Sequence, residues 1–229
     1  MSLTSLVRSL ADNKQLLGLR YAEWATRAPS LEADIAAAAM GLDDIGHSRV
    51  LYGCLEPLGA PAPEPGAERY AAARMLDAPW DAWAQFVAAN AVLDTAFTVV
   101  IEALQEGSVE VLRTRLRKML MEERYHFLHG RGWLREGVDE AVVERAWREA
   151  LEFFGPPGGD VDELRASGRA GAGRDELRDR LGARLELTLP EPEIDWGRWD
   201  GERRRTASGT LDAATFAVLR GGGEAATHV

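Results

Sequence analysis

Apolar residues recur at helical spacing along most of this chain, and no stretch alternates convincingly in the manner of a strand. Leu3, Leu10, Leu17 and Trp24 repeat every seven residues, which predicts a first helix from Ser2 or Thr4 to about residue 28. Pro29 interrupts that pattern and Ser30 offers a new cap. A second helix is therefore expected from residue 31 to Gly59, with one apolar face made of Leu31, Ile35, Ala38, Leu42, Ile45 and Leu51.

Two more long helices are expected after a loop. Residues 60–66 carry three prolines and a terminal glycine, which favours a loop, and a short helix is expected over residues 68–76. The third long helix is predicted from about Pro79 to Glu106 and the fourth from about Val109 to Arg135. Four long helices joined by mostly short connections, with one longer link, predict an all-α four-helix bundle with one crossover.

The rest of the chain predicts a helical extension. Helices are expected over residues 139–154, from residue 160 up to the glycines at 168–173, over 174–189 and over 211–219. Residues 1–155 should thus form the bundle, residues 156–220 a C-terminal helical extension packed on it, and residues 221–229 a disordered tail. The run Arg203-Arg204-Arg205 is expected to be solvated.

Composition narrows the possible partners. The net charge of −10 argues against nucleic acid, because phosphate binding needs a basic surface. A lone cysteine, Cys54, excludes an internal disulfide framework and fits a reducing compartment. We find no signal peptide at residues 1–6, and the run at residues 93–101 is shorter than a membrane span and contains Asp94. A cytoplasmic protein without membrane partners is expected.

Candidate chemistry lies on two of the predicted helices. Asp44 and His47, like Glu123 and His126, are an acid and a histidine three residues apart, so each pair shares one helix face. Both pairs interrupt otherwise apolar stripes, and buried carboxylates and imidazoles are costly unless they are paired or bind metal. Asp94 also interrupts an apolar stripe and precedes Glu123 by 29 residues, a helix–loop–helix distance. Ferritin-like di-metal bundles use such a constellation, completed by a carboxylate from a fourth helix.

The first helix does not supply that carboxylate. At the matching level it carries Lys14, on the stripe with Leu10, Leu17 and Tyr21, while Glu23 lies about two and a half turns away. A protonated lysine cannot bind a metal. Asp44, Asp94 and Glu123 with Lys14 leave a net charge of −2, which balances at most one divalent ion, or none if His47 and His126 are cations.

The residues therefore leave four possibilities open. The leading hypothesis is a degenerate site in which the Lys14 ammonium fills the metal position and pairs with Asp44, Asp94 or Glu123. The alternatives are a single divalent ion, iron or manganese, a full di-metal site of Asp44, His47, Asp94, Glu123 and His126, and no convergence of these residues.

Several segments resemble a known family. Arg20-Tyr21-Ala22-Glu23-Trp24, the run from Ala28 to Ile35, Gly41-Leu42-Asp43, Glu123-Arg124-Tyr125-His126 and Arg131-Gly132-Trp133-Leu134 resemble the C subunit of ring-1,2-phenylacetyl-CoA epoxidase. The match covers residues 10–155 well. Both acid–histidine pairs look more like those of the catalytic A subunit of that complex, whereas Lys14 is what keeps the chain similar to the C subunit.

The resemblance implies a ferritin-like fold and a role in aerobic phenylacetate catabolism. It implies a structural, non-catalytic subunit that pairs with a catalytic subunit of the same oxygenase complex. A homodimer is expected in addition to that pairing or in its place. The competing class is a stand-alone ferritin-like mono- or di-metal oxidase or oxygenase.

Overall fold

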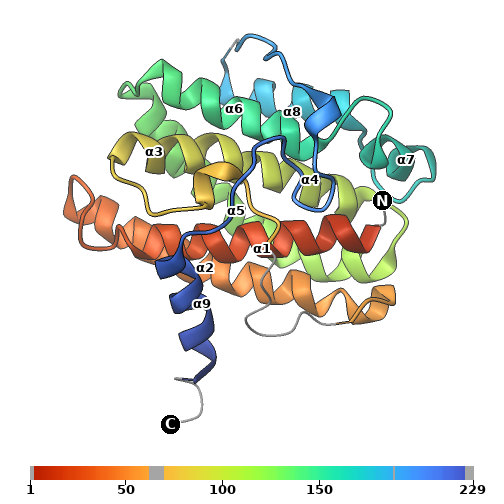
Figure 1. Ribbon diagram of the computed structural model, residues 1–229, viewed down its shortest axis with the longest axis horizontal. Helices are drawn as coiled ribbons and strands as arrows, with labels where there is room; N and C mark the ends of the chain where they lie inside the picture. Colours follow the sequence, from red (N-terminus) through yellow and green to blue (C-terminus); the bar gives the residue numbers. More distant parts are fainter. Residues whose placement is uncertain (1–2, 62–69, 188, 225–229) are drawn as a thin grey trace.

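Four long helical segments form a bundle in the computed structural model, which describes residues 3–61, 70–187 and 189–224 (Figure 1). They are α1 (Leu3–Ala22), α2 (Leu31–Gly53), a composite of α3 (Trp83–Ala88), the π-helix η3 (Ala89–Asp94) and α4 (Thr95–Glu106), and α5 (Glu110–Arg135). Helix α1 packs along α2, α4 along α5, and α2 against α5. The described residues contain only one isolated bridge, Asp200–Arg205, and no strand, so the predicted all-α, ferritin-like fold is confirmed.

Helices α6 (Glu140–Phe154) and α8 (Arg174–Leu185) form a second layer on the bundle (Figure 1). The shorter elements are η1 (Glu56–Leu58), η2 (Arg74–Leu76), α7 (Asp160–Ala166), η4 (Trp196–Arg198) and α9 (Ala213–Glu224). Of these, α7 and α9 lie where the sequence predicts short helices. Whether residues 1–155 and 156–220 behave as separate units stays a prediction.

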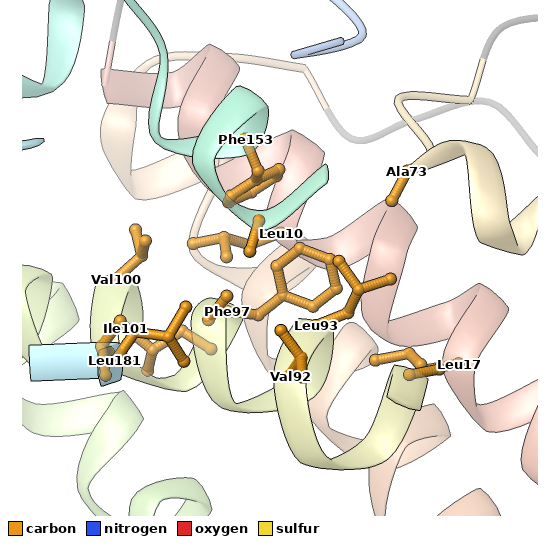
Figure 2. Close-up of a cluster of buried hydrophobic side chains, with 14 of the residues drawn as sticks. Leu10, Leu17, Ala73, Val92, Leu93, Phe97, Val100, Ile101, Phe153 and Leu181 are labelled. Carbon is orange, nitrogen blue, oxygen red and sulfur yellow. The ribbon is translucent and has the colours of Figure 1, made fainter. Parts of the chain in front are cut away.

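The second layer shares the core of the bundle. Figure 2 shows Leu10 of α1, Leu93 and Phe97 of the composite helix and Phe153 of α6 gathered around one another, and the same cluster includes Leu181 of α8. All five side chains are buried. Segments far apart in sequence therefore exclude water together, which is the main stabilising term of a fold of this kind.

Helix boundaries follow caps more closely than apolar patterns. Ser30 caps α2 as expected, because its hydroxyl accepts a hydrogen bond from the Ala33 amide. Helix α1 ends at Ala22, before the predicted residue 28, as the amides of Trp24, Ala25 and Arg27 bond to carbonyls three residues back. The third helix begins at Trp83, because the Gln85 side chain accepts bonds from the amides of residues 81 and 82.

Other expectations need correction. The short helix expected at residues 68–76 is only η2, and residues 68 and 69, like residues 62–66 of the expected loop, lie outside the described residues. Residues 221–224, the start of the expected disordered tail, continue α9, and disorder of the tail stays a prediction. Residues 225–229 lie outside the described residues.

The predicted apolar face of α2 is wrong only in part, because Leu51 is buried as expected. Leu31, Ile35 and Leu42 are exposed, whereas the alanine-rich stripe of Ala33, Ala37 and Met40 is buried. The reason is the short distance between α1 and α2. A Cβ added at Gly18 would lie 2.8 Å from the Gly41 carbonyl oxygen, so only small residues fit along this contact. The larger leucines and isoleucine are left on the outside.

The run at 203–205 is solvated only in part, because Arg204 and Arg205 are buried. Arg204 donates to both oxygens of Asp160, at 2.6 and 3.1 Å, and Arg205 donates to Asp77 at 2.8 Å. Sequence reading could not place these partners, which lie 44 and 128 residues away. The C-terminal segment is thereby fixed to the bundle.

The composite segment Trp83–Glu106 has the length and apolar character of a membrane span, and 94% of its most apolar window is buried inside the protein. A core helix of a bundle meets the same criteria. The expectation of a cytoplasmic location stays a prediction.

Candidate metal centre

The structure brings all six predicted site residues to one point in the bundle. Each of the four long helical segments contributes: Lys14 from α1, Asp44 and His47 from α2, Asp94 from η3, and Glu123 and His126 from α5. All six side chains are buried, and Lys14 is 0% exposed. The possibility that these residues do not converge is therefore wrong.

Lys14 lies at the centre of this cluster. Its Nζ donates hydrogen bonds to Asp94 Oδ1 and Glu123 Oε1, and to Asp44 Oδ1 at 3.0 Å. An ammonium group has three protons to donate, so three carboxylates use all of them. The sequence predicted that Lys14 pairs with one carboxylate, whereas the Lys14 ammonium contacts all three.

Neighbouring charges outweigh the effect of burial on Lys14 and Glu123, but not on Asp44. Burial alone would lower the pKa of Lys14, but Asp44, Asp94 and Glu123 raise it well above its ordinary value. Burial likewise opposes ionisation of Glu123, yet Lys14, His126 and His47 hold its pKa well below the usual range. The pKa of Asp44 is raised, by burial and by the neighbouring charge of Asp94.

His47 contacts carboxylates with both ring nitrogens. Its Nδ1 lies 2.8 Å from Glu123 Oε1 and 3.2 Å from Asp44 Oδ1, and its Nε2 lies 3.0 Å from Glu122 Oε2. A carboxylate only accepts hydrogen bonds, so this arrangement favours a ring protonated at both nitrogens. Burial lowers the pKa of His47, but the bonds to Asp44 and Glu123 outweigh it and raise the pKa to about 10.

His126 has a similar environment. Its Nδ1 lies 3.1 Å from Asp94 Oδ2, and its Nε2 lies 3.5 Å from Asp43 Oδ2 without a hydrogen bond. Burial lowers its pKa, but Glu123, Asp94 and Asp44 together raise it to about 9. With both rings protonated, Lys14 and the two imidazolium groups would balance the charges of three ionised carboxylates.

Two hydroxyl groups donate hydrogen bonds to the carboxylates of the cluster. The Tyr21 hydroxyl donates to Asp94 Oδ2 at 3.0 Å, and Thr98 Oγ1 lies 2.8 Å from Glu123 Oε2. Burial, then the charges of Asp94 and Asp44, raise the pKa of Tyr21, so it remains a proton donor. Tyr21 stands two turns from Lys14 on the same stripe and Thr98 one turn after Asp94, so helical spacing could have identified both.

The π-helix that carries Asp94 was not expected. Such segments insert one residue into an α-helix and occur often at functional sites. A close approach between helices accompanies it here, because a Cβ added at Gly130 of α5 would lie 2.8 Å from Ala91 Cα. Asn90 Oδ1 also lies 3.1 Å from His129 Nδ1, which ties the same segment to α5. A pattern of regular helical periodicity cannot predict the one-residue insertion of a π-helix.

The donors present fit one metal ion. Asp44, Asp94, Glu123 and His126 each offer a ligand atom, and these atoms lie within 4.8 Å of one another. Asp44 Oδ2 is buried without a hydrogen-bond partner. A ferritin-like pair of ions takes a carboxylate from each of four helices, and α1 contributes Lys14 to this cluster instead. Even one ion would compete with the Lys14 ammonium for the same carboxylate oxygens.

The bundle and its cluster define the class: a ferritin-like helical protein whose four long helical segments meet at a buried carboxylate–histidine group. The chain belongs to the family described as phenylacetic acid catabolic protein, whose model matches residues 1–213. This confirms the resemblance found in the sequence.

Two relatives come from Escherichia coli (strain K12). The chain is 27% identical to the C subunit of 1,2-phenylacetyl-CoA epoxidase over 177 residues, which cover 71% of this chain and 69% of the relative. It is 26% identical to the A subunit of the same enzyme over 231 residues, which cover 87% of this chain and 73% of the relative. The chain is thus similar to two different components of one enzyme.

The histidines predict how stability depends on pH. Folding raises the pKa from 6.5 to about 10 for His47 and to about 9 for His126. Both protonated rings therefore contribute their full stabilisation below pH 6.5. That contribution is lost as the pH rises through the folded values. Urea unfolding should give a free energy that decreases between about pH 7 and pH 10, by at most about 1.4 kcal/mol per pH unit for each histidine.

The control is the double variant His47→Gln/His126→Gln, which should be less stable but clearly less dependent on pH over the same range. An equal decrease in wild type and double variant would show that other groups are responsible.

Proposed function

We propose that this chain is a non-catalytic subunit of a phenylacetyl-CoA epoxidase-type complex, with a degenerate di-metal site and a scaffolding role toward a catalytic subunit of the same fold. The observation that carries the proposal is the Lys14 ammonium, bonded to Asp44, Asp94 and Glu123. It supplies the positive charge that a metal would supply in a ferritin-like enzyme. The family match supports the pathway, phenylacetate catabolism.

The position of Lys14 favours a structural role over a catalytic one. Breaking a buried ionic network by removing one partner costs about 3–5 kcal/mol, because unpaired charges remain in the core. Lys14 therefore stabilises the bundle in the absence of metal. A catalytic di-metal centre has the opposite requirement, since it needs carboxylates and neutral imidazoles available to the metal.

A single-metal oxidase is the second candidate. It is supported by the four ligand atoms within 4.8 Å of one another and by the unpartnered Asp44 Oδ2. Asp44, Asp94, Glu123 and His126 would then hold the ion, with His47 beside it, and the ion would supply oxygen activation. For that, Lys14 must leave its three carboxylates and His126 must release a proton.

An exposed apolar surface fits the scaffolding role. The α2–α5 ridge consists of six side chains that are each 43% to 76% exposed: Leu31, Ile35 and Leu42 on α2, and Met121, Tyr125 and Leu128 on α5. The two helices run antiparallel side by side, since His47 contacts Glu122 and His126 lies near Asp43. Exposed apolar patches of this kind mark interaction sites.

The ridge carries charges that suit an acidic partner surface. Arg117 and Arg124 are exposed on the same face of α5 as Met121 and Tyr125, and neither makes an ion pair within the described part of the chain. We assign the ridge to a catalytic homologue of the A subunit, because this chain is similar to both components of one enzyme. A second copy of this chain is the alternative occupant.

Oxygen consumption tests the non-catalytic role. The isolated chain, incubated with ferrous iron and freed of excess metal, should consume no oxygen in the presence of phenylacetyl-CoA and an electron donor. Co-purified with an A-type subunit, it should restore activity that the A-type subunit lacks by itself. Catalytic oxygen consumption by the isolated, iron-loaded chain would contradict the proposal and support the single-metal oxidase.

Charged substitutions test the ridge. Leu42→Glu/Tyr125→Glu should weaken association with the A-type partner at least about 100-fold, about 2.8 kcal/mol, because the interface would bury unpaired carboxylates. Analytical ultracentrifugation can measure the affinity. The control is Val218→Glu, at a side chain 54% exposed on α9, which should bind normally. Unchanged binding by the double variant would exclude the ridge, and loss of a homodimer instead would identify a second copy as its occupant.

A further inference from the structure

A cavity of about 920 Å³ lies outside the cluster. Its walls come from η2 and the loop after it, from the start of α3, from α6, from η4 and from the C-terminal loop at residues 206–209. None of the six cluster residues lines it. The volume lies within the range of small-molecule sites, roughly 300–1,000 Å³.

Three arginines give this cavity a positive character. Arg74, Arg145 and Arg198 line it from three different elements, and none makes an ion pair among the residues that the structure describes. Guanidinium groups suit phosphate and carboxylate, which they can bind through two parallel hydrogen bonds.

The acidic residues of the same walls already have partners. Asp77 accepts from Arg205 at 2.8 Å, and Glu152 accepts from the Thr206 hydroxyl at 2.7 Å and from Arg148 at 3.3 Å. Glu149 accepts from the Met75 amide at 2.8 Å, and burial raises its pKa to about 7, which reduces its negative charge. Among the lining acids only Asp81 is exposed and without an ion pair in the described chain.

The walls are held in place by buried bonds. Arg205 donates to the carbonyl oxygens of Ala72 and Gly209, at 2.8 and 2.7 Å, and so joins the C-terminal loop to the segment before η2. The Thr206 amide also donates to Glu152 of α6 at 3.0 Å. A rigid wall lowers the entropic cost of binding a ligand.

We propose that this cavity binds a small molecule with at least two anionic groups, of which phosphate is the chemistry that Arg74, Arg145 and Arg198 fit best. Arginines from three elements suit one multiply charged ligand better than separate single charges. The inference is independent of the function proposed for the metal cluster.

Calorimetric titration with inorganic pyrophosphate at low ionic strength tests this inference. The full chain should bind one pyrophosphate, and Arg145→Gln/Arg198→Gln should weaken binding at least tenfold. Arg74→Gln alone should weaken it as well. The matched control is Arg169→Gln, an exposed arginine outside the cavity, which should bind as wild type does. All four substituted side chains are exposed, so circular dichroism should show an unchanged fold.

Three results would overturn the proposal: no measurable binding of pyrophosphate, equal weakening in the Arg169→Gln control, or binding unchanged by the double variant. Citrate serves as the second probe. Binding of citrate as tight as that of pyrophosphate would contradict the preference for phosphate.

Discussion

The bond between one buried ammonium and three buried carboxylates is the interaction on which the centre of this bundle depends. Asp44, Asp94 and Glu123 come from three different helical segments, and their charges would repel one another across the core without a cation. Lys14 supplies that cation from the remaining helix. The cluster therefore joins all four long segments, in addition to the apolar core around Leu10 and Phe97.

Several features of the fold serve this arrangement. The π-helix ends at Asp94, and Gly130 lets α5 approach that segment closely. Gly18 and Gly41 allow α1 to lie near α2, which brings Lys14 within reach of Asp44. The same close contact leaves the larger apolar residues of α2 on the surface, where they form part of the ridge assigned to a partner. Internal packing and the proposed assembly thus share one cause.

The sequence was sufficient for the all-α fold, the long helices and the six cluster residues, because helical spacing places Asp44 with His47 and Glu123 with His126 on single faces. It was insufficient where the outcome depends on tertiary contacts. The exposure of Leu31 and Leu42 on α2 depends on the close contact at Gly18, which is distant in sequence, and the burial of Arg204 depends on Asp160, 44 residues away. The π-helix departs from regular periodicity, and the contact of Lys14 with three carboxylates requires four helices in register.

Metal content after substitution at position 14 tests directly whether the Lys14 ammonium takes the place of a metal ion. If Lys14 takes the place of a metal ion, wild type purified from medium rich in iron and manganese should contain at most one ion per chain. Lys14→Glu, which restores a fourth carboxylate, should bind more metal and approach two ions, whereas Lys118→Glu, at a side chain 86% exposed, should match wild type. Two ions in wild type, or unchanged metal content in Lys14→Glu, would contradict the account.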